Sequence, residues 1–117
     1  MKSRRLSLLF FALLVPSRAL VAIPQAPRRI EIVASRFSYE PKEVTLKKGQ
    51  PVVLVLRSTD VTHGLKIEEM NVKSEIKKGQ DTEIAITPAE VGHFVGKCAH
   101  FCGKGHGSMT LEIDVTE

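Results

Sequence analysis

Apolar and polar residues alternate in short runs along most of the chain, beginning near Arg28. Val44 and Leu46 flank Thr45, whereas the run from Val52 to Leu56 is apolar throughout. Alternation with a period of two predicts strands with one buried face, and an unbroken apolar run predicts a strand covered on both faces. No segment sustains the 3.6-residue period of an amphipathic helix. The predicted strands centre on Ile30–Ile32, Val44–Leu46, Val52–Leu56, Ile84–Ile86, Phe94–Lys97 and Leu111–Val115.

Turn signals separate these runs at regular intervals. Lys47–Gln50 and Lys77–Gln80 are identical tetrapeptides, and each stands between two apolar segments. Their glycines favour reverse turns, and their differing flanks argue against a sequence repeat. Pro88–Gly92 marks a further break. About seven short strands in a domain of roughly ninety residues predict an all-β fold of the β-sandwich type.

Residues 1–19 have the features of a secretory signal peptide. Met1–Arg5 is basic, and Leu6–Val15 is apolar apart from one serine. A proline follows, and then small residues suited to cleavage after Ala19, with Ala22 as the alternative. This interpretation makes residues 20–27 a linker and residues 28–117 the folded domain, and it predicts a periplasmic or other extracytoplasmic location. The rival interpretation is an uncleaved anchor, but ten apolar residues are few against the roughly 20 of a spanning helix.

The charge of the chain adds little to this picture. The net charge of +4 is carried by four basic residues among the first eighteen, and the remainder is formally neutral. A neutral body without a basic stripe argues against a nucleic-acid partner. A membrane is expected as a partner only if the N-terminal segment stays uncleaved. No Ser/His/Asp arrangement, phosphate-binding glycine loop or carboxylate pair predicts an enzyme that acts alone.

Four candidate metal ligands fall within twelve residues near the C-terminus: Cys98, Cys102, His106 and Met109. Two cysteines in an exported protein usually suggest a disulfide, which is the simpler interpretation. Thiolate, imidazole and thioether together are instead the ligand set that favours copper. Glycines interleave the four residues, so the segment suits a tight loop around an ion rather than a helix or strand.

His63 is the distant ligand candidate, in the polar turn-like segment Asp60–Gly64. Asp60 could orient His63 by a hydrogen bond or could cap its own backbone, and both alternatives stay open. Phe94 and Phe101 could form an apolar wall of the metal pocket, although core packing explains them equally well. His93 is expected to face outward from a strand.

The segment from Cys98 to Met109 resembles the CuA loop of cytochrome c oxidase subunit II and of the C-terminal domain of nitrous oxide reductase. Val61–His63 resembles the upstream histidine segment of that family, and Gly92–Phe94 resembles the strand before the first cysteine. The resemblance spans roughly residues 30 to 115. It implies a cupredoxin-like Greek-key β-sandwich that relays single electrons through two copper ions.

The resemblance also implies a ligand set. The Cys98 and Cys102 thiolates would bridge both coppers, and His63 and His106 would each bind one. Met109 and the backbone carbonyl of His100 would be weak ligands. Redox proteins, either cytochrome c-like or a terminal oxidase, would be the electron donor and acceptor.

Some features depart from that family. His100 stands where many oxidase subunits have glutamate, and the chain has no tryptophan. One alternative within the same fold is a mononuclear blue-copper site, because His63, Cys102, His106 and Met109 alone satisfy its ligand pattern, which would leave Cys98 spare. Others are a copper-delivery protein and an accessory subunit of an oxidase, each with the same ligands.

Overall fold

The computed structural model describes residues 11–20, 26–100 and 103–117, and within this last range it describes His106 only in its backbone. Residues 11–20 are exposed and have no regular secondary structure. The predicted signal peptide thus lies partly outside the described residues. No helix in the described part of the chain is long and apolar enough to span a membrane.

The described residues form nine strands and two short 3₁₀ turns. Their bounds are β1 (Arg28–Ser35), β2 (Ser38–Glu40), β3 (Glu43–Lys47), β4 (Val52–Ser58), β5 (His63–Ile67), η1 (Glu68–Met70), β6 (Val72–Ile76), β7 (Thr82–Ile86), β8 (Gly92–Lys97), η2 (His106–Ser108) and β9 (Thr110–Thr116).

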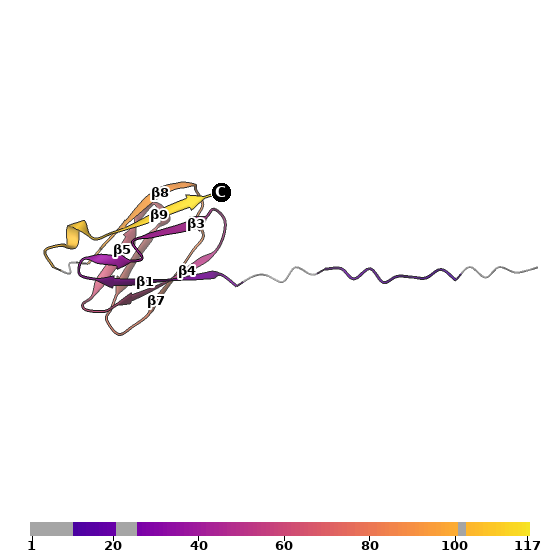
Figure 1. Cartoon of the computed structure of the whole chain (residues 1–117), viewed down its shortest axis with the longest axis horizontal. Coiled ribbons are helices and arrows are strands. Elements are labelled where there is room, and N and C mark those ends of the chain that lie inside the picture. The colour runs from indigo at the N-terminus through magenta and orange to yellow at the C-terminus, as the bar shows by residue number, and fades with distance from the viewer. Residues whose placement is uncertain (1–10, 21–25, 101–102) are drawn as a thin grey trace, which may run out of the picture.

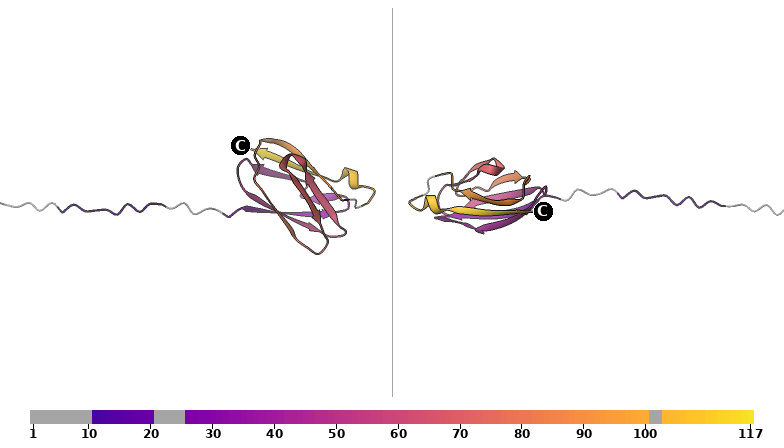
Figure 2. Two further views of the ribbon diagram at one scale, coloured as in Figure 1. Left: turned by 180° about the vertical axis from the view of Figure 1, so that it is seen from behind. Right: turned by 90° about the horizontal axis from the view of Figure 1, so that it is seen from above.

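Two sheets pack against each other as a sandwich (Figures 1 and 2). One sheet has four strands in the order β2-β1-β4-β7, and the other has five in the order β3-β9-β8-β5-β6. The pairs β1·β4 and β3·β9 are parallel, and the remaining strand pairs are antiparallel. The predicted all-β sandwich is confirmed.

The nine strands exceed the expected seven or so, and three of them, β2, β5 and β6, fall outside the six segments predicted as strands. These strands are short, and the sequence of β6, Val72–Ile76, places charged residues between only two apolar ones. Such segments become strands through pairing with their neighbours rather than through their own pattern. His63, which was predicted to lie in a turn, is the first residue of β5 and pairs with Ile76.

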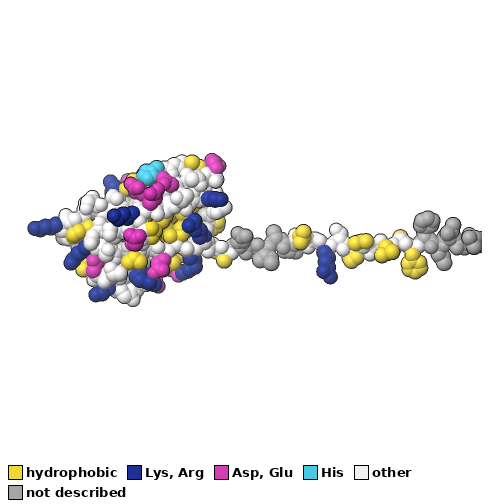
Figure 3. All heavy atoms as spheres, in the orientation of Figure 1, with side chains coloured by type: hydrophobic (Ala, Val, Ile, Leu, Met, Phe, Trp, Pro, Cys, Tyr) yellow, Lys and Arg dark blue, Asp and Glu magenta, His cyan; other side chains and the backbone are white. Residues whose placement is uncertain are grey.

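The core lies between the sheets and follows the predicted alternation. Fully buried side chains come from the inner faces of both sheets, among them Ile32, Leu54, Leu56, Leu65, Ile67 and Ile113. Burial of each such side chain contributes roughly 1.5–3 kcal/mol. On the outer face of β4, Arg57 contacts Asp81 and Glu31 at 2.8 and 2.5 Å. Figure 3 shows charged side chains of both signs scattered over the visible face.

Both Lys-Lys-Gly-Gln segments are reverse turns, as predicted. Gly49 and Gly79 have φ values of 77° and 81°, which few other residues adopt without strain. In each turn the fourth residue donates its N–H to the carbonyl of the first, at 3.2 Å from Gln50 to Lys47 and 3.3 Å from Gln80 to Lys77. Each turn carries the chain from the five-stranded sheet to the four-stranded one, from β3 to β4 and from β6 to β7.

The connection between β8 and β9 lies at one end of the sandwich, away from the C-terminus (Figure 1). Cys98 follows β8 directly, and Met109 immediately precedes β9. β5 begins at His63 and runs antiparallel to β8, with Lys66 opposite Lys97. His63 therefore starts its strand at the end of the sandwich where β8 ends.

Candidate metal centre

The structure brings His63, Cys98 and Met109 to the same end of the sandwich. The Cys98 N–H donates to the Met109 carbonyl at 3.3 Å, which sets the two ends of the predicted loop side by side. Gly64 lies directly against this loop, because a Cβ built there would be 3.0 Å from the His100 nitrogen. The backbone beside His63 thus touches the segment that begins with Cys98.

The His63 side chain is fully buried, and only one of its two ring nitrogens has a hydrogen-bond partner among the described residues. Its Nε2 lies 2.7 Å from Asp60 Oδ1. Its Nδ1 is buried and has no hydrogen-bond partner among the described residues. An ionised carboxylate only accepts hydrogen bonds, so Nε2 carries the hydrogen and Nδ1 presents a lone pair. A buried nitrogen without a partner is costly, by roughly 1–3 kcal/mol, unless something binds it. Nδ1 therefore has a lone pair available to bind a metal ion.

Asp60 is held by three donors that together fix its position. Oδ2 accepts the Arg36 N–H at 2.8 Å, and Oδ1 accepts the Val61 N–H at 2.6 Å in addition to His63. Partial burial raises the pKa of Asp60, but the bonds from Arg36, His63 and Val61 outweigh it and hold that pKa at about 2. Asp60 thus makes both kinds of contact that the sequence left open: a hydrogen bond with His63 and hydrogen bonds with backbone N–H groups.

The low pKa of Asp60 predicts an acid-sensitive contribution to stability. A depressed carboxyl pKa stabilises the fold above its ordinary range near 4, and this contribution is lost as the pH falls through about 2. The metal-free wild type should lose free energy of unfolding between pH 6 and pH 2. In the Asp60→Asn variant we expect this loss to be smaller by about 2 kcal/mol. Urea unfolding at both pH values measures it, and an unchanged pH dependence would refute the prediction.

Cys98 and the His100 carbonyl, two predicted ligand groups, are in contact. Cys98 is 7% exposed, and its Sγ lies 3.0 Å from the carbonyl oxygen of His100. Met109 is 1% exposed and packs in the same core cluster. The buried thiol and thioether are soft ligands that suit Cu(I), and the His63 imidazole at the same end of the sandwich suits Cu(II).

The rest of the predicted ligand set is only partly described. Cys102 and Phe101 lie outside the described residues, and His106 begins η2 with its side chain likewise outside them. Within the described residues alone, no group of three or more His, Cys, Asp or Glu side chains gathers as a metal site. The assignment of Cys102 and His106 therefore remains a prediction.

Two residues that contact the loop or the backbone beside His63 were not predicted from the sequence. The Phe37 ring lies over the loop, because a Cβ on Gly103 would be 2.8 Å from it and one on Gly105 would overlap it. The Tyr39 hydroxyl, which is buried, donates to the Gly64 carbonyl at 2.5 Å. Both residues come from the β1–β2 hairpin, far away in sequence, and no motif marked them.

Gly105 provides a test of this packing. We expect Gly105→Ala to weaken copper binding about tenfold, because the added methyl group would displace the Phe37 ring or the loop beneath it. Competition with a copper chelator measures the effect. Gly107→Ala is the matched control, since nothing lies within 4 Å of its added Cβ. Removing the ring with Phe37→Ala should restore affinity in the Gly105→Ala background, and failure to do so would contradict the packing argument.

The other aromatic and histidine candidates lie elsewhere. Phe94 lines a cavity with Met70 and Ile86, and its ring folds back to 3.5 Å from a Cβ built on Gly92. The structure does not bring it to the predicted ligands. His93 is exposed, as expected, and its Nδ1 lies 2.6 Å from Asp114, a contact that raises the pKa of His93. The half-exposed His100 ring lies 3.9 Å from Glu75.

Comparisons with known proteins identify the family and the fold. A family model described as a cupredoxin-like domain matches residues 5–111. A cytochrome c oxidase subunit 2 of Thermus thermophilus is 28% identical over 102 residues, covering 87% of this chain and 76% of that protein. A probable cytochrome c oxidase subunit 2 of Streptomyces coelicolor is 36% identical over 70 residues, covering 60% of this chain. The chain spans only 22% of that longer relative, and 61% of a second Thermus thermophilus subunit.

Solved structures show the same fold. The periplasmic domain of cytochrome oxidase subunit II from Bradyrhizobium japonicum superposes with a TM-score of 0.73 at 20% identity, covering 82% of this chain and 88% of that one. Auracyanin from Roseiflexus castenholzii superposes with a TM-score of 0.62 at 20% identity, covering 80% of this chain and all of that one. The predicted cupredoxin-like Greek-key β-sandwich is confirmed.

Proposed function

The chain belongs to the cupredoxin-like domain family, and from this premise we propose that it relays single electrons through a binuclear copper centre of the CuA type. The observation that carries the proposal is the buried His63 Nδ1, which has no hydrogen-bond partner among the described residues. It lies at the end of the sandwich that also holds the Cys98 thiol and the Met109 thioether.

Copper would be held by His63 and Met109, by Cys98 and the His100 carbonyl, and by the predicted ligands Cys102 and His106. When bound, it would supply the one-electron step by alternating between Cu(I) and Cu(II). Asp60 fixes the tautomer and the orientation of His63. The strands anchor both ends of the loop, so the ligands keep their places when the charge of the site changes.

Two coppers are favoured over one by the position of Cys98. A mononuclear site made by His63, Cys102, His106 and Met109 would leave a buried thiol unused beside the His100 carbonyl. In a binuclear site both groups are ligands. The half-exposed His100 ring then lies at the rim and leaves its carbonyl for the metal.

The names of the relatives support a location and a class of partner. One related structure is described as a periplasmic domain, and several relatives are named as subunits of cytochrome c oxidase. We infer an extracytoplasmic protein with residues 1–19 as its signal peptide and residues 28–117 as its folded domain. Its donor and acceptor would be redox proteins, either a cytochrome c-like protein or a terminal oxidase.

Stopped-flow mixing of the oxidised, copper-loaded protein with a reduced c-type cytochrome tests the proposed function. We expect the cytochrome to be oxidised as the copper absorption bleaches, with one electron accepted per chain. If the cytochrome stays reduced and a chelator rapidly removes the copper, the chain is instead a copper-delivery protein.

A further inference from the structure

The Tyr39 side chain joins the two sheets beside the candidate metal centre. It comes from β2, at the edge of the four-stranded sheet, and it is fully buried. Its hydroxyl donates a hydrogen bond to the carbonyl of Gly64, the second residue of β5 in the five-stranded sheet. Because Gly64 directly follows His63, this bond holds the backbone next to a predicted copper ligand.

Gly64 in turn contacts the ligand loop through its bare backbone. A Cβ built on Gly64 would lie 3.0 Å from the His100 nitrogen and 3.2 Å from the Ala99 carbonyl carbon. Such a Cβ would be tighter against the loop than ordinary van der Waals contact allows. The φ of Gly64 is not positive, so the glycine is needed here for the close approach and not for its backbone conformation.

The His100 carbonyl lies on the far side of this contact. The peptide from Ala99 to His100 touches Gly64, and the His100 carbonyl oxygen lies 3.0 Å from Cys98 Sγ. A series of direct contacts thus runs from the Tyr39 hydroxyl through Gly64 to the backbone that carries this predicted weak ligand.

Given the proposed electron relay, on which this step depends, we propose that Tyr39 and Gly64 are positioning residues that keep the reduction potential of the centre low. They hold the His100 carbonyl in place as a weak copper ligand, and weak ligands of this kind tune the potential of copper sites. Oxygen is a harder ligand than sulfur, so it stabilises the oxidised site more than the reduced one. A His100 carbonyl that is displaced therefore raises the potential.

Tyr39→Phe tests this role, because it removes the hydroxyl and keeps the ring. The Gly64 carbonyl loses its donor, and we expect reduction of the loaded centre to become more favourable by roughly threefold to tenfold, where tenfold is about 59 mV for one electron. Gly64→Ala should shift the potential in the same direction, because its methyl group displaces the peptide from Ala99 to His100. Redox titration of the visible copper absorption measures both shifts. An unchanged potential in Tyr39→Phe would overturn the proposal.

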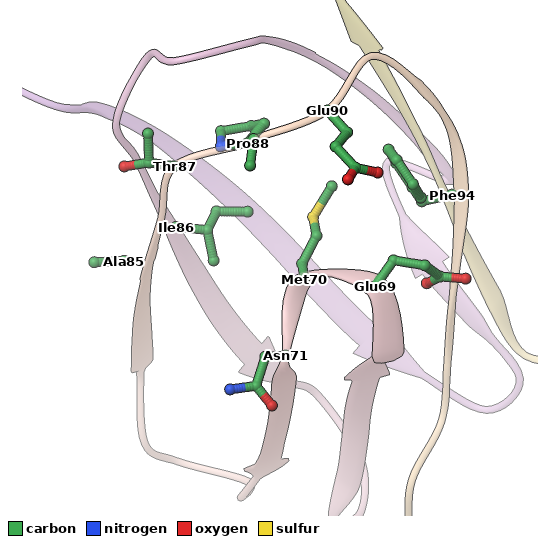
Figure 4. Close-up of a pocket in the computed structure, with 10 residues that line it drawn as sticks. Glu69, Met70, Asn71, Ala85, Ile86, Thr87, Pro88, Glu90 and Phe94 are labelled. Carbon is green, nitrogen blue, oxygen red and sulfur yellow. The ribbon is translucent and has the colours of Figure 1, made fainter.

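Ile86→Val is the matched control for a general loss of stability. Ile86 is 9% exposed and lines a cavity of about 350 Å³ (Figure 4). It pairs with Val52 at the start of β4, whereas the β1 partner of Tyr39, Ala34, pairs with Ser58 at the end of that strand. Loss of one buried methyl group should destabilise the fold about as much as loss of one hydrogen bond. The potential should stay at the wild-type value, and a shift equal to that of Tyr39→Phe would overturn the proposal.

Amide hydrogen exchange in the reduced, metal-free protein tests the same contacts without copper. The Cys98 N–H, which donates to the Met109 carbonyl at 3.3 Å, reports on the loop, and the amides of β9 report on the core. Tyr39→Phe should speed exchange at Cys98 about tenfold more than within β9. Equal acceleration at both places would overturn the positioning role. Because no copper takes part, this result separates a failure of the positioning role from a failure of the proposed electron relay.

Discussion

Cys98→Ser is expected to lower the copper content from roughly two ions per chain to about one and to abolish the spectrum of a binuclear centre. The thiolate of Cys98 is one of the two bridges that the proposed centre requires. A serine hydroxyl is a hard and weakly acidic ligand, so it does not replace a bridging thiolate. Copper analysis of the loaded variant, together with its visible spectrum, measures the result.

Cys102→Ser is the informative partner of that variant. In a binuclear centre the two cysteines are equivalent bridges, so both variants should lose the binuclear spectrum. In the mononuclear alternative, Cys98→Ser would keep its copper and colour while Cys102→Ser would lose both. A Cys98→Ser protein with unchanged copper content and spectrum would therefore contradict the binuclear assignment.

Asp60→Ala is expected to weaken copper binding by about 10–100-fold. The carboxylate holds His63 through Nε2 and holds the Arg36 and Val61 amides at the same time. Without it, Nε2 loses its acceptor and the buried ring can adopt either tautomer, so Nδ1 no longer reliably presents its lone pair. Chelator competition on the reduced protein gives the change in affinity.

The control for Asp60→Ala is Asp81→Ala, which removes an exposed carboxylate whose contact is with Arg57. That change should leave copper affinity within twofold of the wild type. Asp60→Asn should be intermediate, because the amide oxygen can still accept one hydrogen bond from His63 or Arg36. Full copper affinity in Asp60→Ala would show that His63 needs no orienting partner and would remove Asp60 from the site.

The parts of the fold that follow from local pattern could be predicted from the sequence. The alternation around Val44 and Leu46 and the apolar run Val52–Leu56 became strands with the expected burial. The glycines of the two Lys-Lys-Gly-Gln turns have the positive φ that such turns need. The ligand candidates were recognisable because their chemistry depends on residue type and spacing.

The parts that depend on distant contacts could not be predicted. Phe37 lies over a loop more than sixty residues later, and Tyr39 donates a hydrogen bond to the Gly64 carbonyl. Both residues belong to the β1–β2 hairpin, whose position is defined only by the complete sandwich. β6 is a strand because it pairs with β5, not because of its own sequence. For Phe94 the sequence left open a wall of the metal pocket or core packing; the ring packs against the core and turns toward Gly92 and the cavity at the opposite end.

The binuclear centre is tested most directly by the copper stoichiometry of the processed protein, loaded after reduction of its thiols, together with its electron paramagnetic resonance spectrum. We predict two coppers per chain and a seven-line hyperfine pattern from one unpaired electron shared by two copper nuclei. One copper per chain with a four-line pattern would contradict it and would assign the site to a mononuclear copper centre.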